Sequence, residues 1–162
     1  MNEAELQVGE CACTRCQSAC QNRPGVFLPD QITVLARALG LTEQELFEKH
    51  LQVDWWVEHP TTFMLAPRLE REKGGSLYPA DPRGRCHWFV DGKCVIHVCG
   101  KPAECMQLGH KDGRNVHADR AQIVAAWRDQ QELIHQLYCG ELTAPPSNLF
   151  GLLARAGHRS SD

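Results

Sequence analysis

Four of the chain's nine cysteines lie in one run of ten residues, and this run constrains the fold most strongly. They are Cys11, Cys13, Cys16 and Cys20. Core packing does not explain so dense a group, because a small apolar side chain would fill the same space and crowded thiols oxidise unless they are occupied. A second group lies far along the chain: Cys86, Cys94, Cys99 and Cys105. We predict that the two groups meet in space and hold metal.

The cysteine content also bears on the compartment. The first residues, Met1–Leu6, are acidic and lack the apolar segment of a signal peptide, so we expect no export signal. In a reducing cytoplasm, such cysteines bind metal or catalyse more often than they form disulfides. An odd count of nine leaves one thiol over in any fully paired scheme. Disulfides, or cysteines that only fill the core, remain the alternative.

Length and composition favour one globular domain. The chain has 162 residues, 43% of them hydrophobic and 23% charged, near the average for globular proteins. The net charge is −3 and the Lys and Arg residues are scattered, so we expect no nucleic-acid partner. No apolar run approaches the ~20 residues of a membrane span, so we expect no membrane partner.

We expect a flexible N-terminus over residues 1–10 and a cysteine-cluster metal-binding domain over 11–140. Residues 141–162 are predicted to form a linker, a short helix and a polar tail. The fold class is predicted to be α+β: a small, mostly helical domain with a short β-hairpin and irregular cysteine loops. The first cysteine group precedes a Pro-Gly turn and is itself predicted to be a loop or tight knuckle.

Capping residues mark the predicted helices. One helix starts at Pro29-Asp30 with Asp30 as its N-cap and stops at Gly40. Thr42–Glu45 is a capping box that opens a second helix. A long helix is predicted from Asp119 to about Tyr138, and a short one near residues 148–154.

Aromatic and apolar residues mark the predicted strands. Residues 61–66 are predicted to form a strand, and residues 67–85 a long loop. The adjacent Trp55 and Trp56 are expected to pack against the helices. The alternative is that one of them contacts a protein partner.

A β-hairpin is predicted around Asp91-Gly92, because this dipeptide suits a type I′ turn. Phe89 then pairs with Cys94. An extended ladder would place Cys86 opposite His97 and about 10 Å from Cys94, too far for both thiols to bind one ion. Short or bulged strands are the alternative.

The spacing of Cys13, Cys16 and Cys20 is C-x2-C-x3-C, which supplies three thiolates from one segment. Two residues between thiolates let both sulfurs reach one ion, with Zn–S distances near 2.3 Å. A thioredoxin-like redox pair is disfavoured, because no βαβ pattern surrounds these residues. The predicted metal ligands are Cys13, Cys16, Cys20, Cys86, Cys94 and Cys105, followed by Cys99, Cys11 and His97. Glu104 is expected to be a solvated charge, and Cys139 a structural residue.

These motifs resemble the YkgJ-type family of small bacterial cysteine-cluster proteins. The family pattern is C-x2-C-G-x-C-C, C-x-F-L, C-x-I-Y and R-P-x-x-C. It is met in part here, at Cys13–Cys20, Cys86–Phe89, Cys94–His97 and Lys101–Cys105. The departures are Gln17 in place of Gly, Ala19 in place of one cysteine, His97 in place of Tyr and Lys101 in place of Arg. The resemblance implies a zinc- or iron-chelating domain without an agreed reaction. Cys11 or Cys99 would replace the missing cysteine, or the site would hold fewer ions.

Zinc and iron both suit thiolate-rich sites, and iron could be part of an iron–sulfur cluster. The predicted hairpin spacing slightly favours iron. The leading functional prediction is a metal-binding protein without an assigned reaction. The alternatives are an iron–sulfur enzyme or electron carrier, and an interaction module with structural zinc. No nucleophilic triad, phosphate loop or dinucleotide fingerprint is present.

Overall fold

A small mixed sheet forms the centre of the molecule. In the computed structural model, which describes residues 14–106 and 120–143, β1 (Leu51–Trp56) pairs antiparallel with β2 (His59–Pro67). β3 (Ser76–Leu77) adds parallel to β1, giving the order β2-β1-β3. Every residue of β1 is buried, as expected for a central strand that is covered on both faces. Helices and small sheets together confirm the α+β class.

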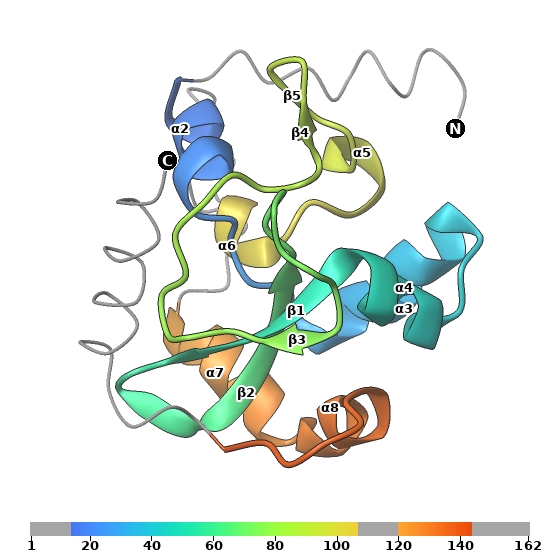
Figure 1. Ribbon diagram of the computed structural model, residues 1–162, viewed down its shortest axis with the longest axis vertical. Coiled ribbons are helices and arrows are strands. Elements are labelled where there is room, and N and C mark those ends of the chain that lie inside the picture. Colours follow the sequence, from blue (N-terminus) through green and yellow to red (C-terminus); the bar gives the residue numbers. More distant parts are fainter. Residues whose placement is uncertain (1–13, 107–119, 144–162) are drawn as a thin grey trace.

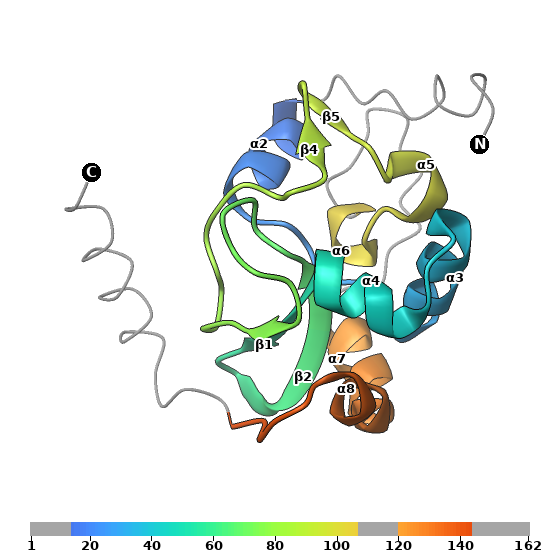
Figure 2. The same cartoon turned by 45° about the vertical axis from the view of Figure 1, so that its right-hand side comes forward.

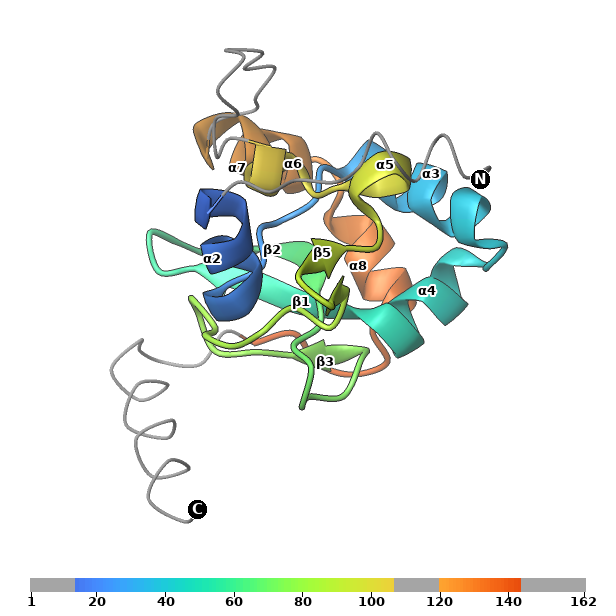
Figure 3. The ribbon, with the colours of Figure 1, turned by 90° about the horizontal axis from the view of Figure 1, so that it is seen from above.

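Helices and a second, two-stranded sheet surround this centre. The further elements are α2 (Thr14–Asn22), α3 (Pro29–Leu39), α4 (Glu43–His50), β4 (Phe89–Val90), β5 (Lys93–Cys94), α5 (His97–Gly100), α6 (Ala103–Met106), α7 (Arg120–Arg128) and α8 (Gln131–Leu137). Figures 1 and 2 show α2, the β4–β5 hairpin and α5 at one end of the molecule and α8 at the other. Seen from above, the hairpin lies between α2 and α5 (Figure 3). The elements that carry Cys20, Cys94 and Cys99 therefore gather at one end.

The helical pair α3–α4 forms nearly as predicted. Gly40 ends α3 in the left-handed conformation, with φ of 67°. The Thr42 capping box is confirmed, since Thr42 accepts from the Glu45 N–H and the Glu45 side chain accepts from the Thr42 N–H. The predicted N-cap Asp30 is wrong, because α3 already starts at Pro29. The Gln31 side chain instead accepts a hydrogen bond from the Leu28 N–H, at 2.8 Å.

The first cysteine segment is a helix where it is described, and the prediction of a loop is wrong there. α2 runs from Thr14 to Asn22 and contains no Pro or Gly that would interrupt it. The spacing of Cys16 and Cys20 is compatible with a helix as well as with a knuckle, since residues four apart lie on one helical face. Pro24-Gly25, where a turn is predicted, follows the helix in irregular structure.

The predicted long helix is two helices. α7 ends at Arg128 and α8 begins at Gln131. The Gln131 side chain binds the backbone of Phe63 like an added strand: its Oε1 accepts from the Phe63 N–H at 3.0 Å and its Nε2 donates to Phe63 O at 2.8 Å. Because β2 is an edge strand, this side chain satisfies backbone groups that the sheet leaves open. The change of direction between α7 and α8 brings Gln131 to this edge.

Both adjacent tryptophans are buried, with 2% of Trp55 and 3% of Trp56 exposed. The Trp55 indole donates to Tyr78 O at 2.9 Å, and the guanidinium of Arg120 lies over the Trp56 ring at 4.3 Å. Packing of both rings is therefore confirmed. Neither ring is exposed, so the structure offers no tryptophan surface for the predicted contact with a protein partner.

Some predictions fall outside the described residues, namely the flexible N-terminus, the N-cap Asp119 and the short helix near residues 148–154. The predicted loop 67–85 is mostly irregular but contributes β3. Among the described helices, none has the length and apolar character that crossing a lipid bilayer requires.

Replacing Gln131 by Ala tests its role at the sheet edge. The change leaves the Phe63 N–H and carbonyl without their partner, so we expect the free energy of unfolding to fall by about 1–3 kcal/mol in urea denaturation. Gln136→Ala removes an exposed side chain from the same helix and is the matched control, expected to change stability by less than about 0.5 kcal/mol. Equal effects of the two substitutions would contradict this role.

Candidate metal centre

Cys94 lies in β5 of the β4–β5 hairpin. The strands of this hairpin are shorter than the extended ladder considered from the sequence. Phe89 pairs with Cys94 across the predicted type I′ turn, in which both Asp91 and Gly92 have positive φ. The predicted pairing of Cys86 with His97 is wrong. Cys86 forms an isolated bridge with Leu69 instead, and His97 begins α5. The separation of about 10 Å between Cys86 and Cys94, which was predicted from an extended ladder, therefore does not apply.

Cys20 and Cys94 meet between α2 and β5. The Cys20 thiol donates a hydrogen bond to Cys94 Sγ, which raises the pKa of Cys20 and lowers that of Cys94. The Ile96 N–H also bonds to Cys94 Sγ and lowers its pKa further. A second contact joins the same elements, because Gln17 Nε2 donates to Gly92 O at 3.3 Å. The predicted meeting of the two cysteine groups is confirmed for this pair.

Cys86 and Cys105 are buried, and backbone N–H groups bond to both sulfurs. Burial raises the pKa of Cys86 to about 12, and hydrogen bonds from the backbone of Trp88 and Phe89 offset part of that rise. Burial also raises the pKa of Cys105, while the Gly25 N–H, 3.2 Å from Cys105 Sγ, lowers it. Both sulfurs therefore have donors that stabilise the charged thiolate.

Charge interactions link all four thiols. After the hydrogen bond to Cys94 and burial, the charges that Cys105, Cys94 and Cys86 carry when ionised each raise the pKa of Cys20. The end of α2 also pairs with the second cysteine segment, because the Cys86 N–H donates to Cys20 O at 2.7 Å. Residues far apart in the sequence are thus held in one neighbourhood.

The described side chains do not complete a metal site by themselves. Within 14–106 and 120–143, no three His, Cys, Asp or Glu side chains form a group that could hold an ion. Cys11 and Cys13 lie outside the described residues, and Cys16 is placed only by its backbone, one turn before Cys20 in α2. These three predicted ligands belong to the segment that leads into the cluster.

The remaining predicted ligands lie around this neighbourhood. Cys99, in α5, is half-buried, and its Sγ donates to Ile96 O at 3.9 Å. His97 is the first residue of the same helix. Cys139 is exposed and comes two residues after the end of α8. Figure 1 shows α8 at the other end of the molecule.

Sequence reasoning missed the positive charge of Lys101. This residue is only 4% exposed, and its ammonium lowers the pKa of both Cys94 and Cys105 as a lesser contribution after burial and hydrogen bonding. The match of Lys101 to the Arg of the family motif was the one available signal. A buried cation here favours thiolates over thiols.

Gly25 brings the segment after α2 against α6. A Cβ atom at Gly25 would lie 2.8 Å from Cys105 N and 2.9 Å from Cys105 Sγ, so no larger residue fits without displacement. The next residue exchanges two hydrogen bonds with Glu104: the Val26 N–H donates to Glu104 Oε2 at 2.8 Å, and Val26 O accepts from the Glu104 N–H at 3.1 Å. The expectation that Glu104 is solvated is wrong, because only 11% of its side chain is exposed.

An ionic network lies beside this contact. Arg23 Nε is 2.6 Å from Asp81 Oδ1, and Arg23 Nη1 is 3.5 Å from Glu104 Oε1. Arg120 Nε is also 3.5 Å from Glu104 Oε1. Asp54, fully buried in β1, is close enough for the charge of Arg23 to lower its pKa against the larger effect of burial. These pairs join the segment after α2 to α6 and to the loop before Cys86, and they join α6 to α7.

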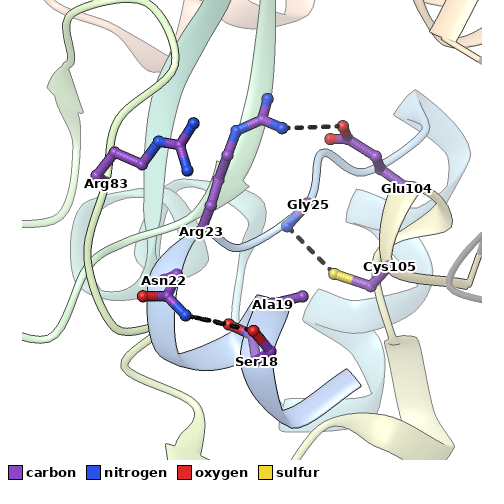
Figure 4. A pocket seen from close by; sticks show the side chains of 8 residues that line it. All are labelled: Ser18, Ala19, Asn22, Arg23, Gly25, Arg83, Glu104 and Cys105. Atoms are coloured by element: carbon purple, nitrogen blue, oxygen red, sulfur yellow. Dashed lines mark hydrogen bonds and ion pairs between the residues drawn. The ribbon is translucent and has the colours of Figure 1, made fainter. Parts of the chain in front are cut away.

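A cavity of about 360 Å³ opens beside the cysteine cluster (Figure 4). Its lining comes from the end of α2, the segment after it, the loop before Cys86, and α6. The lining residues are Ser18, Ala19, Asn22, Arg23, Gly25, Arg83, Glu104 and Cys105. Cys105 therefore faces both the cluster and a space that a small molecule could enter.

No protein-family model matches the chain, and searches of curated proteins and of solved structures also found no match. The resemblance to the YkgJ-type family therefore stays a prediction.

Replacing Asp54 by Asn tests the effect of its burial. Burial raises the pKa of Asp54 to about 7, whereas an unfolded chain has a value near 4. Between about pH 4 and 7 the folded state thus binds more protons than the unfolded state, so the contribution of Asp54 to stability is lost as the pH rises. We expect the stability of Asp54→Asn, relative to the wild type, to increase from about pH 4 to pH 8.

Urea denaturation over this pH range measures the difference. Asp129→Asn, which changes an exposed carboxylate in the turn between α7 and α8, is the control. Stability curves of Asp54→Asn and the wild type that run parallel over the whole range would contradict the role of Asp54.

Proposed function

We propose that the chain is a metal-binding protein that holds zinc or iron through its cysteine cluster. The observation that carries this proposal is the supply of backbone N–H donors to three described sulfurs. Trp88 and Phe89 serve Cys86, Ile96 serves Cys94, and Gly25 serves Cys105. Such donors stabilise thiolates, the form in which cysteine binds metal.

The burial of the thiols supports the same proposal. Cys86 and Cys105 are only 5% and 6% exposed, and their pKa values are raised, so without metal both carry protons. Hydrogen-bond donors aimed at neutral thiols would bring little stability. A bound cation would displace the protons and make full use of those donors.

We propose that the ligands missing from the described group come from Cys13 and Cys16, with Cys11, Cys99 and His97 as further candidates. The meeting of Cys20 with Cys94 supports this, because it brings the first cysteine segment to the second. Cys16 lies one turn before Cys20, and residues four apart share a helical face. The arrangement would then hold the irregular end of the α+β domain together.

Metal identity is open between zinc and iron, including an iron–sulfur cluster. The predicted preference for iron rested on the extended ladder, and the short hairpin removes that reason. A tetrahedral zinc site needs four ligands, whereas a cluster tolerates thiolates spread over a wider space. We place this function in the reducing cytoplasm, where the thiols remain available.

The cavity beside Cys105 favours an iron–sulfur enzyme or electron carrier over an interaction module with structural zinc. An iron–sulfur enzyme or electron carrier needs access to its metal, and this cavity would provide it. An interaction module with purely structural zinc needs no such access. A metal-binding protein with a cavity at its metal is therefore our conclusion, and a catalytic role is the second candidate.

Substitution of single cysteines tests the site. We expect Cys94→Ser and Cys105→Ser to lower both the metal content after anaerobic purification and the melting temperature, because metal binding and folding are coupled. Cys139→Ser removes an exposed thiol outside the cluster and is the control, expected to keep both values. Full metal content in both cluster variants would refute these ligands.

Elemental analysis with a visible spectrum decides between the metals. Stoichiometric iron and sulfide with broad absorption near 400 nm would be expected for a cluster, and a colourless protein with zinc for a single-ion site. Protein that contains no metal, and whose cysteines all titrate as free thiols, would overturn the proposed function.

A further inference from the structure

The ionic network at the cavity beside Cys105 has, among the described residues, more guanidinium groups than carboxylates. Three guanidinium groups, those of Arg23, Arg83 and Arg120, share the two carboxylates of Asp81 and Glu104 among the described residues. Arg83 Nη2 is 3.2 Å from Asp81 Oδ2, so Asp81 serves two arginines, as Glu104 does. Counted over residues 14–106 and 120–143 alone, three guanidinium groups against two carboxylates leave one positive charge over in this network.

A third carboxylate, that of Asp54, lies near but compensates only part of this charge. Its Oδ1 accepts a hydrogen bond from the Trp55 N–H at 2.7 Å. Burial raises the pKa of Asp54 to about 7, so it is only partly ionised at neutral pH. Asp54 does not line the cavity.

Two nitrogens of Arg23, in the cavity wall, have no hydrogen-bond partner among the described residues. One is Nε, which still forms the ion pair with Asp81. The other is Nη2, which is also buried. Buried guanidinium nitrogens are nearly always hydrogen-bonded in folded proteins, so an open one indicates a missing acceptor. Figure 4 shows Arg23 and Arg83 on the same side of the cavity, away from Cys105.

The two arginines differ in depth. The Arg23 side chain is 20% exposed and the Arg83 side chain 55%, so one lies in the wall and the other at the rim. A volume of about 360 Å³ falls at the small end of the range for ligand pockets. Planar guanidinium groups bind carboxylates and phosphates through paired hydrogen bonds.

We propose that this cavity binds a small organic anion, a molecule with a carboxylate or phosphate group, through Arg23 and Arg83. The anion supplies the acceptor that Arg23 Nη2 lacks and the negative charge that the network lacks. Its other end lies toward Cys105. That the anion thereby sits beside a metal rests on the proposed function, whereas the anion site itself rests on the two arginines.

Calorimetric titration of the full chain with malonate, and separately with inorganic phosphate, tests the site. Malonamide has the shape of malonate without its charge and is the control ligand. We expect saturable binding of at least one of the two anions and much weaker binding of malonamide. No saturable binding of either anion, or equal affinity for malonate and malonamide, would overturn the site.

Variants assign the binding to the two arginines. We expect Arg83→Gln to weaken anion binding about tenfold or more, as the loss of hydrogen bonds between charged groups implies. Arg23→Gln is expected to abolish it. Arg37→Gln, an exposed substitution in the last turn of α3, is the matched control and is expected to bind as the wild type does.

Arg83→Gln keeps the test valid if Arg23→Gln fails to fold, because Arg83 is half-exposed and its described ion pair is with Asp81 alone. Equal weakening in Arg83→Gln and Arg37→Gln would overturn the site. If Arg83→Gln changes metal content but not anion affinity, the guanidinium groups balance the thiolates instead, and the anion site is wrong.

Metal content measured on the same samples separates the two proposals. Protein without metal that binds malonate through Arg83 would overturn the metal function and support the anion site. Metal-loaded protein that binds neither anion would support the metal function and overturn the anion site.

Discussion

The cysteine end of the molecule depends on the short irregular segment from Arg23 to Phe27, which contacts several other elements. The Phe27 N–H donates to Leu65 O of β2 at 2.9 Å, and Phe27 O accepts from the Trp127 indole at 2.6 Å. Two residues earlier, Gly25 packs directly against Cys105. One stretch of backbone therefore joins the sheet, α7 and α6, and it starts where α2 ends. This joint therefore helps to fix the position of α2 relative to the sheet and to α6.

The same joint creates a conflict within the thiol cluster. Packing at Gly25 buries Cys105, and burial favours the neutral thiol. The Gly25 N–H and the buried Lys101 ammonium favour the thiolate. A site that only needed to be apolar would contain neither donor nor cation. The proposed metal ion would resolve the conflict, because it would supply the charge that makes a buried thiolate stable.

Local signals allowed the sequence to predict the local parts of the fold, and contacts between distant residues explain most of what it missed. The capping box at Thr42 and the turn at Asp91-Gly92 depend only on neighbouring residues, and both were predicted. The extended ladder beyond Cys94 failed because turn chemistry sets the register but not the length of a hairpin. α2 was misjudged because a C-x2-C-x3-C spacing suits a helix and a knuckle equally. The ion pair between Arg23 and Glu104 joins residues 81 positions apart and leaves no periodic signal in the sequence.

The position of the cavity would make binding of the proposed metal and binding of the proposed anion electrostatically dependent on each other. A zinc ion closed by four thiolates carries a net negative charge and would repel an anion at Cys105, whereas thiols that keep their protons are neutral and would not. The excess guanidinium charge at Arg23 and Arg83 would reduce that repulsion without reversing it. A metal with an open coordination position would instead attract the anion, since the ligand could bind it directly. The sign of the coupling therefore separates the two kinds of site: an anion that binds more tightly once metal is present requires an open position, and a purely structural zinc predicts the opposite.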